Sequence, residues 1–223
     1  MQTTTNSTDN KAAVLQLDAF VWRVGGPISL SIKAGQCLCL WGDSGVGKSM
    51  LLRAIADLDE HEGELSSGEL FCHSTTPTQW RHLIRLVPPE SSWWFPQVAD
   101  HYDALQDADL RALGLPEGIK TQAVEQLSSG EKQRLSLLRA LDSSPRVLLL
   151  DEPTANLDAK NCLRVEALIK SYLEKGGACL WVSHDKAQRE RVADEAFELT
   201  ASGLKANGPK ESDPKENDEE AAV

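Results

Sequence analysis

The sequence contains no long hydrophobic segment. No apolar run in its 223 residues approaches the roughly 18 residues that a membrane-spanning helix needs. The first residues are rich in Thr, Asn and Ser and lack the apolar core of a secretory signal. We therefore expect a soluble chain whose polar residues 1–12 are disordered. The 41% of residues that are apolar are enough to bury the core of one large domain.

Clusters of basic residues are also missing. The formal net charge is −11, and no stripe of Lys and Arg is visible. Binding to nucleic acid needs such a stripe to neutralise phosphates, so we exclude nucleic acid as a partner. From Lys205 onward Pro, Lys, Glu and Asp dominate without apolar periodicity. We therefore expect residues 207–223 to form an acidic, disordered tail.

Cysteine is sparse and lacks metal-ligand spacing. The five cysteines are an odd number, and no pair has two residues between its members. Cys37, Cys39 and Cys179 lie in apolar runs typical of buried strands. We expect reduced thiols in the core rather than a structural metal site.

A glycine-rich loop dominates what is present. One Gly, four free positions and then Gly-Lys-Ser match the phosphate-binding loop pattern. The matching residues are Gly42, Asp43, Ser44, Gly45, Val46, Gly47, Lys48 and Ser49. An apolar run at 36–41 predicts a buried strand before the loop, and 50–56 predicts the first turns of a helix after it. Strand, loop and helix are the context that this pattern requires.

The residue types in this loop suit a bound nucleotide. Glycines let successive backbone N–H groups converge on phosphate oxygens at a helix N-terminus. Lys48 places a positive charge on the β- and γ-phosphates, and the Ser49 hydroxyl is placed to ligate Mg²⁺. The sequence therefore predicts a nucleotide and Mg²⁺ site here.

The remaining pattern predicts an α/β domain. Alternating residues at 14–22 and 28–32, joined by a Gly-Gly-Pro turn, predict an antiparallel hairpin. Continuous apolar runs at 147–150 and 178–183, with an amphipathic helix at 162–173 between them, predict a parallel crossover unit. Ahead of this unit, about residues 90–142 predict an inserted helical subdomain. The expected fold is a P-loop NTPase (RecA-like) with a mostly parallel sheet and an antiparallel hairpin region, over residues 13–206.

Two carboxylates follow the first of these parallel strands. Asp151 and Glu152 come directly after the apolar run, at the sheet edge where open α/β folds bind nucleotides. Asp151 is suited to hold Mg²⁺ together with Ser49. Glu152 is then positioned to orient or deprotonate an attacking water.

A further motif lies upstream of Asp151. Residues 127–134 read Leu-Ser-Ser-Gly-Glu-Lys-Gln-Arg, which resembles the signature motif of ATP-binding cassette (ABC) ATPases, usually Leu-Ser-Gly-Gly-Gln. The resemblance implies that Ser128, Ser129, Gly130 and Glu131 contact the γ-phosphate of an ATP held by another subunit. N–H groups at a helix N-terminus suit that task. Two such domains would then sandwich two ATP molecules, most simply as a homodimer.

The other motifs of that family follow in order. Residues 151–154 resemble the Walker B aspartate and catalytic glutamate, and residues 155–158 resemble the D-loop that communicates across the dimer. His184 resembles the switch histidine that contacts the γ-phosphate, so the implied catalytic set is Lys48, Glu152 and His184. Trp22 occupies the place of the aromatic residue that stacks on adenine, with Phe20 as the alternative.

Two places depart from the family pattern. Where the Q-loop glutamine is expected, the chain has Pro88-Pro89-Glu90. Glu90 is our expected substitute toward the metal, and Gln97 after a shifted loop is the alternative. In the signature, Ser129 replaces the first Gly and Glu131 replaces Gln. These departures bear on the rate of hydrolysis more than on its existence.

Within this family the chain most resembles the ATP-binding subunits of bacterial iron exporters. That resemblance implies a separate membrane permease and a location on the cytoplasmic side of the cell membrane. The aromatic stretch 93–95 lies where the resemblance places the permease's coupling helix. The stretch forms either this docking groove or the core of the helical subdomain.

Three other functions remain open at this point. A poorly hydrolysing regulatory subunit fits the departures at Pro89 and Ser129. An importer ATPase for another small solute would carry the same motifs. A cassette ATPase of DNA repair or translation fits less well, because such proteins resemble long or two-cassette chains with basic surfaces.

Overall fold

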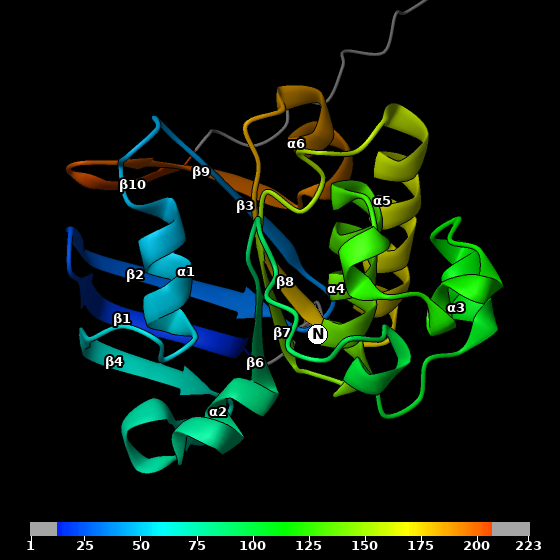
Figure 1. Ribbon diagram of the computed structural model, residues 1–223. Coiled ribbons are helices and arrows are strands. Elements are labelled where there is room, and N and C mark those ends of the chain that lie inside the picture. The colour runs from blue at the N-terminus through cyan, green and yellow to red at the C-terminus, as the bar shows by residue number, and fades with distance from the viewer. Residues whose placement is uncertain (1–12, 207–223) are drawn as a thin grey trace, which may run out of the picture.

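The computed structural model describes residues 13–206. The predictions of disorder at 1–12 and 207–223 lie outside these residues. Two sheets organise the described chain, one of four strands in the order β2-β1-β4-β5 and one of six in the order β10-β9-β3-β8-β7-β6 (Figure 1). Their strands are β1 (Ala13–Trp22), β2 (Gly25–Lys33), β3 (Cys37–Trp41), β4 (His61–Ser67), β5 (Leu70–Phe71), β6 (Ile84–Val87), β7 (Val147–Asp151), β8 (Ala178–Val182), β9 (Glu195–Thr200) and β10 (Gly203–Ala206).

Helices connect and cover these strands. The α-helices are α1 (Lys48–Ile55), α2 (Pro77–Leu83), α3 (Asp107–Ala112), α4 (Ser129–Asp142), α5 (Ala159–Glu174) and α6 (Lys186–Val192). Short 3₁₀ helices occur at Cys72–Ser74, Ala99–His101, Glu117–Thr121 and Val124–Gln126. Within residues 13–206, no helix combines the length and the apolar character that crossing a bilayer requires.

The six-stranded sheet is parallel except at one edge. β6, β7, β8, β3 and β9 pair in parallel, and only β10 pairs antiparallel, with β9. The β7 run Val147–Asp151 is buried throughout, because apolar cores cover both faces of the sheet. Val147 and Leu149 pack with α1 and the antiparallel sheet, whereas Leu148 and Leu150 pack with α4 and α5. This confirms the predicted α/β fold and the parallel pair β7–β8 around α5.

The predicted hairpin is confirmed as β1 and β2, which pair antiparallel. A bulge interrupts β1 at Asp18 and Ala19, and Ala19 has a positive φ of 46°. The Ser29 hydroxyl accepts a hydrogen bond from Ala19 N at 3.1 Å and donates one to Asp18 at 3.1 Å. The extra residue places Leu17 and Phe20, rather than Leu17 and Ala19, on the buried side.

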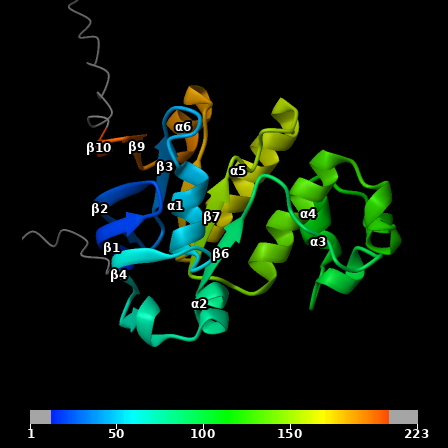
Figure 2. The same cartoon turned by 60° about the vertical axis from the view of Figure 1, so that its left-hand side comes forward.

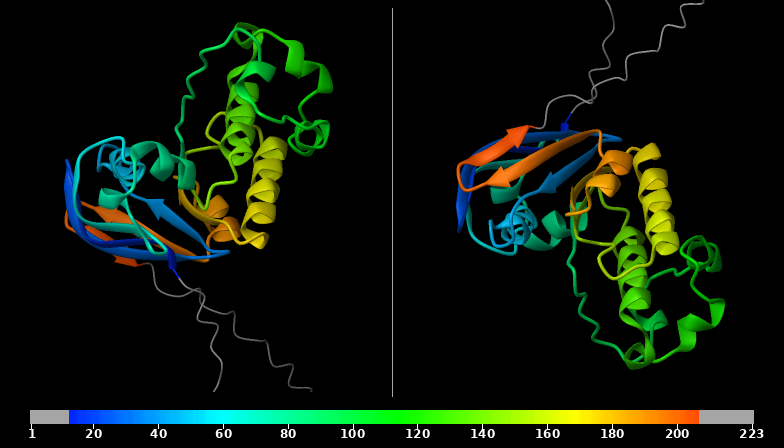
Figure 3. Two further views of the ribbon diagram at one scale, coloured as in Figure 1. Left: turned by 90° about the horizontal axis from the view of Figure 1, so that it is seen from below. Right: turned by 90° about the horizontal axis from the view of Figure 1, so that it is seen from above.

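The inserted segment is less helical than its sequence predicts. Only α3 and α4 are α-helices between residues 90 and 142, and three of the 3₁₀ turns lie between β6 and α4. Figures 2 and 3 show this segment, drawn green, extending from the sheet away from the antiparallel strands. Strands β9 and β10 were not predicted from the sequence, and Lys205, where the tail composition begins, pairs with Glu198.

Candidate functional site

The glycine-rich loop connects β3 to α1 as predicted. Gly42 and Gly47 have φ values of 150° and 103°, a region that favours glycine. A side chain at Gly42 would collide with the carbonyl oxygen of Leu199 in β9, and one at Gly47 would meet Val24. Both glycines are therefore required by close contacts as well as by backbone conformation.

Lys48 closes this loop from its own helix. Its ammonium Nζ donates to the carbonyl oxygens of Gly42 at 2.8 Å and Asp43 at 2.9 Å. Burial lowers the pKa of Lys48, while the carboxylates of Glu152 and Asp151 oppose that shift. The positive charge thus lies over the centre of the loop, near two acidic side chains.

Asp151 and Ser49 meet across the two central elements. Asp151 ends β7 and is 4% exposed. Burial raises the pKa of Asp151, and a hydrogen bond from Ser49 acts in the opposite direction. A hydroxyl and a carboxylate side by side form the hard oxygen donor set that Mg²⁺ prefers.

Glu152 and His184 face each other just beyond the ends of neighbouring strands. His184 Nε2 lies 3.2 Å from Glu152 Oε1, and both side chains are partly exposed. Glu152 has a positive φ of 48°, and its backbone N–H donates to Val182 in β8. A non-glycine residue in this conformation is strained, and such strain occurs mainly at functional positions.

Gln188 in α6 connects the loop after β7 to the loop after β8. Its amide nitrogen donates to Thr154 Oγ1 at 3.0 Å and to Glu166 Oε1 at 3.1 Å. Its amide oxygen accepts a hydrogen bond from Ser183 Oγ at 2.9 Å. Arg191 then pairs with Glu166 at 2.7 Å. Gln188 was not predicted from the sequence, although its position one turn after His184, behind the helix cap Asp185, was a usable signal.

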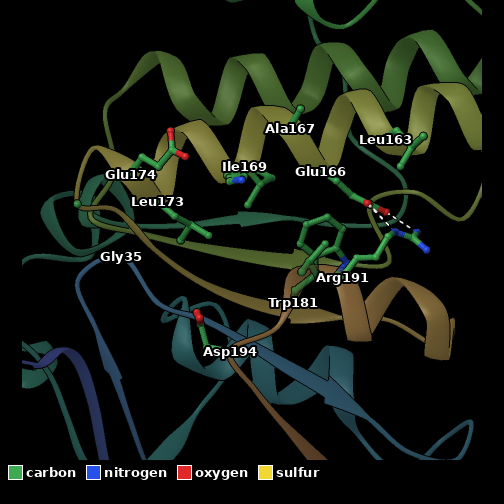
Figure 4. Close-up of a pocket in the computed structure, with 13 residues that line it drawn as sticks. Gly35, Leu163, Glu166, Ala167, Ile169, Leu173, Glu174, Trp181, Arg191 and Asp194 are labelled. Carbon is green, nitrogen blue, oxygen red and sulfur yellow. Dashed lines mark hydrogen bonds and ion pairs between the residues drawn. The ribbon is translucent and has the colours of Figure 1, made fainter. Parts of the chain in front are cut away.

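A separate cavity of about 600 Å³ lies between α5, α6 and β8 (Figure 4). The close-up shows the Glu166–Arg191 pair at one end and Trp181 beside it. None of the predicted nucleotide-site residues lines this cavity. The nucleotide motifs instead gather at the carboxyl ends of β3, β7 and β8, where α/β sheets bind their ligands.

The predicted signature residues begin α4. Ser128 is the N-cap, and Ser128 and Glu131 form a reciprocal capping box. Glu131 Oε2 accepts hydrogen bonds from Ser128 N at 2.9 Å and Ser128 Oγ at 2.7 Å. These bonds lower the pKa of Glu131. The substitution of Glu for Gln thus places a carboxylate charge on the exposed N-terminus of α4.

The loop after β7 lies against this N-terminus. A Cβ at Gly130 would lie 3.1 Å from a methyl carbon of Leu157 and 3.4 Å from the carbonyl oxygen of Asn156. Arg134 donates to Gly130 O at 3.1 Å and to Asn161 Oδ1 at 3.0 Å, which ties α4 to α5. The loop 155–158 and the α4 N-terminus therefore form one packed unit.

Comparison with known proteins agrees with this geometry. The ABC transporter family model matches residues 26–155, which include the phosphate loop, the signature and Glu152. The chain belongs to the ABC transporter family. It carries the ATP-binding, ATP-hydrolysing domain of that family, and the α/β fold with its mixed sheets is the one expected of it.

Curated ABC relatives resemble the chain to similar degrees. Aliphatic sulfonates import ATP-binding protein SsuB 2 of Pseudomonas aeruginosa is 38% identical over 75% of this chain and 63% of its own length. "Probable iron export ATP-binding protein FetA" of Escherichia coli is 34% identical over 71% of this chain and 77% of its own length. Spermidine/putrescine import ATP-binding protein PotA of Spiroplasma citri is 34% identical over 75% of this chain and 52% of its own length.

These comparisons confirm the family but not the closer resemblance to iron exporters. The chain spans just under two thirds of the length of the first of these relatives. Importers and an exporter are named among them at similar identity, so substrate and direction of transport do not follow from the comparison.

Trp22 does not present a ring face to this ABC nucleotide site. Its side chain is 4% exposed and packs against Gly25, where an added Cβ would lie 2.5 Å from the indole ring. The indole Nε1 lies near Gly47, since a Cβ added at Gly47 would be 3.2 Å from it. The stacking on adenine that the resemblance implies would require the indole ring to leave its buried position beside Gly25 and Gly47.

Phe20, the alternative, is also unsuited to stacking on adenine. It is fully buried, and its ring stacks on His61 with 4.9 Å between centroids. The bulge at Asp18 and Ala19 is the physical reason, because it turns both aromatic residues toward the core. Val24 is the apolar side chain exposed at this rim, at 51%, and it lies against Gly47.

The departures at the Q-loop lie beyond the carboxyl end of β6. Glu90 is exposed in the loop three residues after β6, which pairs with β7. Gln97 is distant in the chain from that strand end, and forms an isolated bridge with Ala123. Of the two, Glu90 is nearer along the chain to the sheet edge that carries Asp151.

The aromatic stretch divides between core and surface. Trp93 packs against the core of the inserted segment, whereas Trp94 and Phe95 are 63% and 47% exposed. All three rings surround His101, whose Nε2 accepts hydrogen bonds from the backbone of Trp94 and Phe95. Trp93 thus suits the predicted role in the core of the inserted segment, and Trp94 and Phe95 suit the predicted role in docking.

Proposed function

We propose that this chain is the ATP-hydrolysing subunit of an ABC transporter and powers a separate membrane permease. One observation carries the proposal: Glu152 and His184 face each other at 3.2 Å on the sheet edge that also carries Asp151, with Lys48 of α1 close to both carboxylates. A general base and a polar γ-phosphate contact on one edge suit hydrolysis rather than binding alone.

The chain's own residues divide the work of this reaction. The phosphate loop and Lys48 bind the phosphates, and Glu152 orients and deprotonates the attacking water. His184 holds the Glu152 carboxylate on one side and contacts the γ-phosphate on the other. Neither Ser128 nor Gly130 lies in the phosphate loop of its own chain, so in our proposal they bind the nucleotide of a second, identical chain.

The donor set at Ser49 and Asp151 fits Mg²⁺. These two residues would hold the ion, and Glu90 is the proposed third contributor, through water. Bound Mg²⁺ would neutralise phosphate charge. For adenine, we propose Val24 as the first apolar contact, because it is exposed beside Gly47 while Trp22 is covered.

The exposed pair Trp94 and Phe95 is the proposed docking surface for the permease, which would hold the chain on the cytoplasmic face of the membrane. A cavity of about 320 Å³ lies beside Trp94 and is lined also by Pro88, His101 and Arg139. The Arg139 guanidinium lies 4.4 Å from the Trp93 ring centre and 4.8 Å from that of Trp94. The cation–π contacts and His101 fix the aromatic rings in an exposed position, which favours a binding surface.

The transported substrate we propose is iron or another metal, moved outward, on the strength of the likeness to FetA. An importer ATPase for another small solute is the second candidate, since the SsuB and PotA relatives are named as importers. A poorly hydrolysing regulatory subunit is the third, because of the departures from the family pattern at Pro89 and Ser129.

ATP hydrolysis by the chain with its permease in vesicles, titrated with iron, separates these candidates. Stimulation by iron supports metal export. Hydrolysis that responds instead to an organic solute supports the importer. If the wild type hydrolyses ATP no faster than the Glu152→Gln variant, the result supports the regulatory subunit.

A further inference from the structure

Three chemically distinct donors lie together at the opposite end of α1 from the phosphate loop. Asp57 follows the C-terminus of α1, His61 begins β4, and Cys72 begins the 3₁₀ helix after β5. One carboxylate oxygen, one imidazole nitrogen and the thiol sulfur all lie within 4.8 Å of one another. The cluster shares no residue with the nucleotide site.

The imidazole supplies a second, independent observation. Nδ1 of His61 is buried and finds no hydrogen-bond partner within residues 13–206. A buried polar atom without a partner destabilises the fold, so such atoms call for an explanation. A metal ion that accepts the lone pair of this nitrogen would provide one.

The Cys72 thiol and the Asp57 carboxylate are also placed to bind a metal ion. Cys72 is 7% exposed and is a free cysteine. Asp57 has a positive φ of 56°, which is unusual outside glycine, and one of its carboxylate oxygens lies within 4.8 Å of the ligand atoms of His61 and Cys72. Glycine would end the helix with less strain, so the carboxylate is the feature that distinguishes Asp57.

One neighbour opposes a cation. Arg81 Nη2 lies 3.7 Å from Asp57 Oδ2, and it donates to the Asp57 carbonyl oxygen at 3.0 Å. The 3.7 Å separation is too long for a hydrogen bond, so the carboxylate can turn to another partner. Arg81 should nevertheless weaken binding through charge repulsion.

We propose that Asp57, His61 and Cys72 bind a divalent transition-metal ion of the Zn²⁺ type, with water in the fourth position. Tetrahedral sites with bonds of about 2.0–2.3 Å separate their donors by about 3.3–3.8 Å, so the donors need to close by roughly 1 Å. Sulfur and nitrogen donors select this class of ion over Mg²⁺. On binding, the Cys72 thiol releases its proton to water, and thiolate and carboxylate together neutralise the ion's charge.

Such a site would connect the end of α1 to β4. His61 stacks on Phe20 and pairs with Trp22 across the β1–β4 ladder. A bound ion would therefore stiffen the strand that packs beside the phosphate loop. This expectation goes beyond the proposed transport function, because it requires neither ATP nor a permease.

Titration of the nucleotide-free, Mg²⁺-free full chain with Co²⁺ tests the proposal. We expect one ion per chain with a thiolate-to-cobalt charge-transfer band, bleached by Zn²⁺. Cys72→Ser should remove the band, and His61→Gln should weaken affinity at least tenfold. The matched controls Cys162→Ser and His73→Gln, which change a half-buried thiol and an exposed imidazole, should leave both unchanged.

Two further variants cover the case in which Cys72→Ser does not fold. Asp57→Asn should weaken Co²⁺ binding at least tenfold, and Arg81→Gln should strengthen it. Zn²⁺ should also raise the melting temperature of the wild type but not of His61→Gln. A wild-type chain without a charge-transfer band, or a band that survives in Cys72→Ser, overturns the proposal.

Discussion

His184 Nε2 lies 3.2 Å from Glu152 Oε1, although the two residues are far apart along the chain. The two side chains meet because β7 and β8 pair in parallel, with Asp151 opposite Val182. Sheet register, rather than any local signal, therefore sets the distance between the proposed base and the switch histidine.

We expect Glu152→Gln to reduce ATP turnover at least a hundredfold while leaving ATP binding intact, because the amide cannot accept the proton of the attacking water. The variant should then accumulate as an ATP-bound dimer. Size-exclusion chromatography with and without ATP measures this. A variant that stays monomeric with ATP would contradict the proposed two-chain site.

Glu152→Gly is expected to separate stability from activity. Glycine adopts the φ of 48° at this position without strain, so the free energy of unfolding should stay the same or rise by up to about 1 kcal/mol. Hydrolysis should be lost. Urea denaturation measures the free energy of unfolding, and an ATPase assay measures hydrolysis. Marked destabilisation of Glu152→Gly would show that the positive φ of Glu152 does not destabilise the wild type.

Lys48→Ala should weaken ATP binding at least tenfold. The ammonium bridges the carbonyl oxygens of Gly42 and Asp43, so its removal costs both phosphate contact and loop rigidity. Fluorescent-nucleotide titration measures the affinity. Lys186→Ala, which changes an exposed lysine in α6, is the control.

Glu131→Gln should strengthen ATP-dependent pairing of two chains severalfold. The carboxylate accepts both hydrogen bonds of Ser128 and repels an incoming phosphate, whereas Gln keeps the cap without the charge. The comparison is best made in the Glu152→Gln background by analytical ultracentrifugation. Weaker pairing would mean that the carboxylate is not repulsive there.

Arg191→Ala should destabilise the chain by about 1–2 kcal/mol, because it leaves the buried Glu166 without its cation. Burial would raise the pKa of Glu166, but hydrogen bonds from Arg191 and Gln188 outweigh it and lower the pKa. The pair therefore stabilises the fold above the unfolded-state pKa of Glu, and its contribution is lost as the pH falls through the folded-state value. Thermal unfolding of the wild type and of Arg191→Ala, measured from neutral to acidic pH, should show the difference between their melting temperatures shrinking as the pH falls. A difference that stays constant would contradict the ion pair as the cause of the destabilisation.

Local patterns were enough to predict the phosphate loop, the paired carboxylates and the parallel strands. Each depends on a short apolar run followed by a few chemically distinctive residues, such as Gly42–Ser49 after β3. The Ser128–Glu131 capping box was not predicted, although Ser followed three residues later by Glu is its usual sequence pattern.

Features that depend on tertiary contacts were not predictable in this way. The β1 bulge, stabilised by Ser29 from another strand, buries Trp22 and Phe20. Asp57, His61 and Cys72 come together only when α1, β4 and the segment after β5 fold against each other. Propensity carries no information about such juxtapositions, and this is also why β9 and β10 were missed.

The narrow space between Gly130 and Leu157 restricts which residue position 130 can hold. In a paired assembly, the signature and the D-loop of one chain would both face the neighbouring chain. A Cβ at position 130 would lie 3.1 Å from Leu157, so any side chain there would force one of the two segments to give way by a few tenths of an ångström. A bulkier residue at position 130 would therefore push residues 155–158 away from the start of α4 and distort the surface that both segments share.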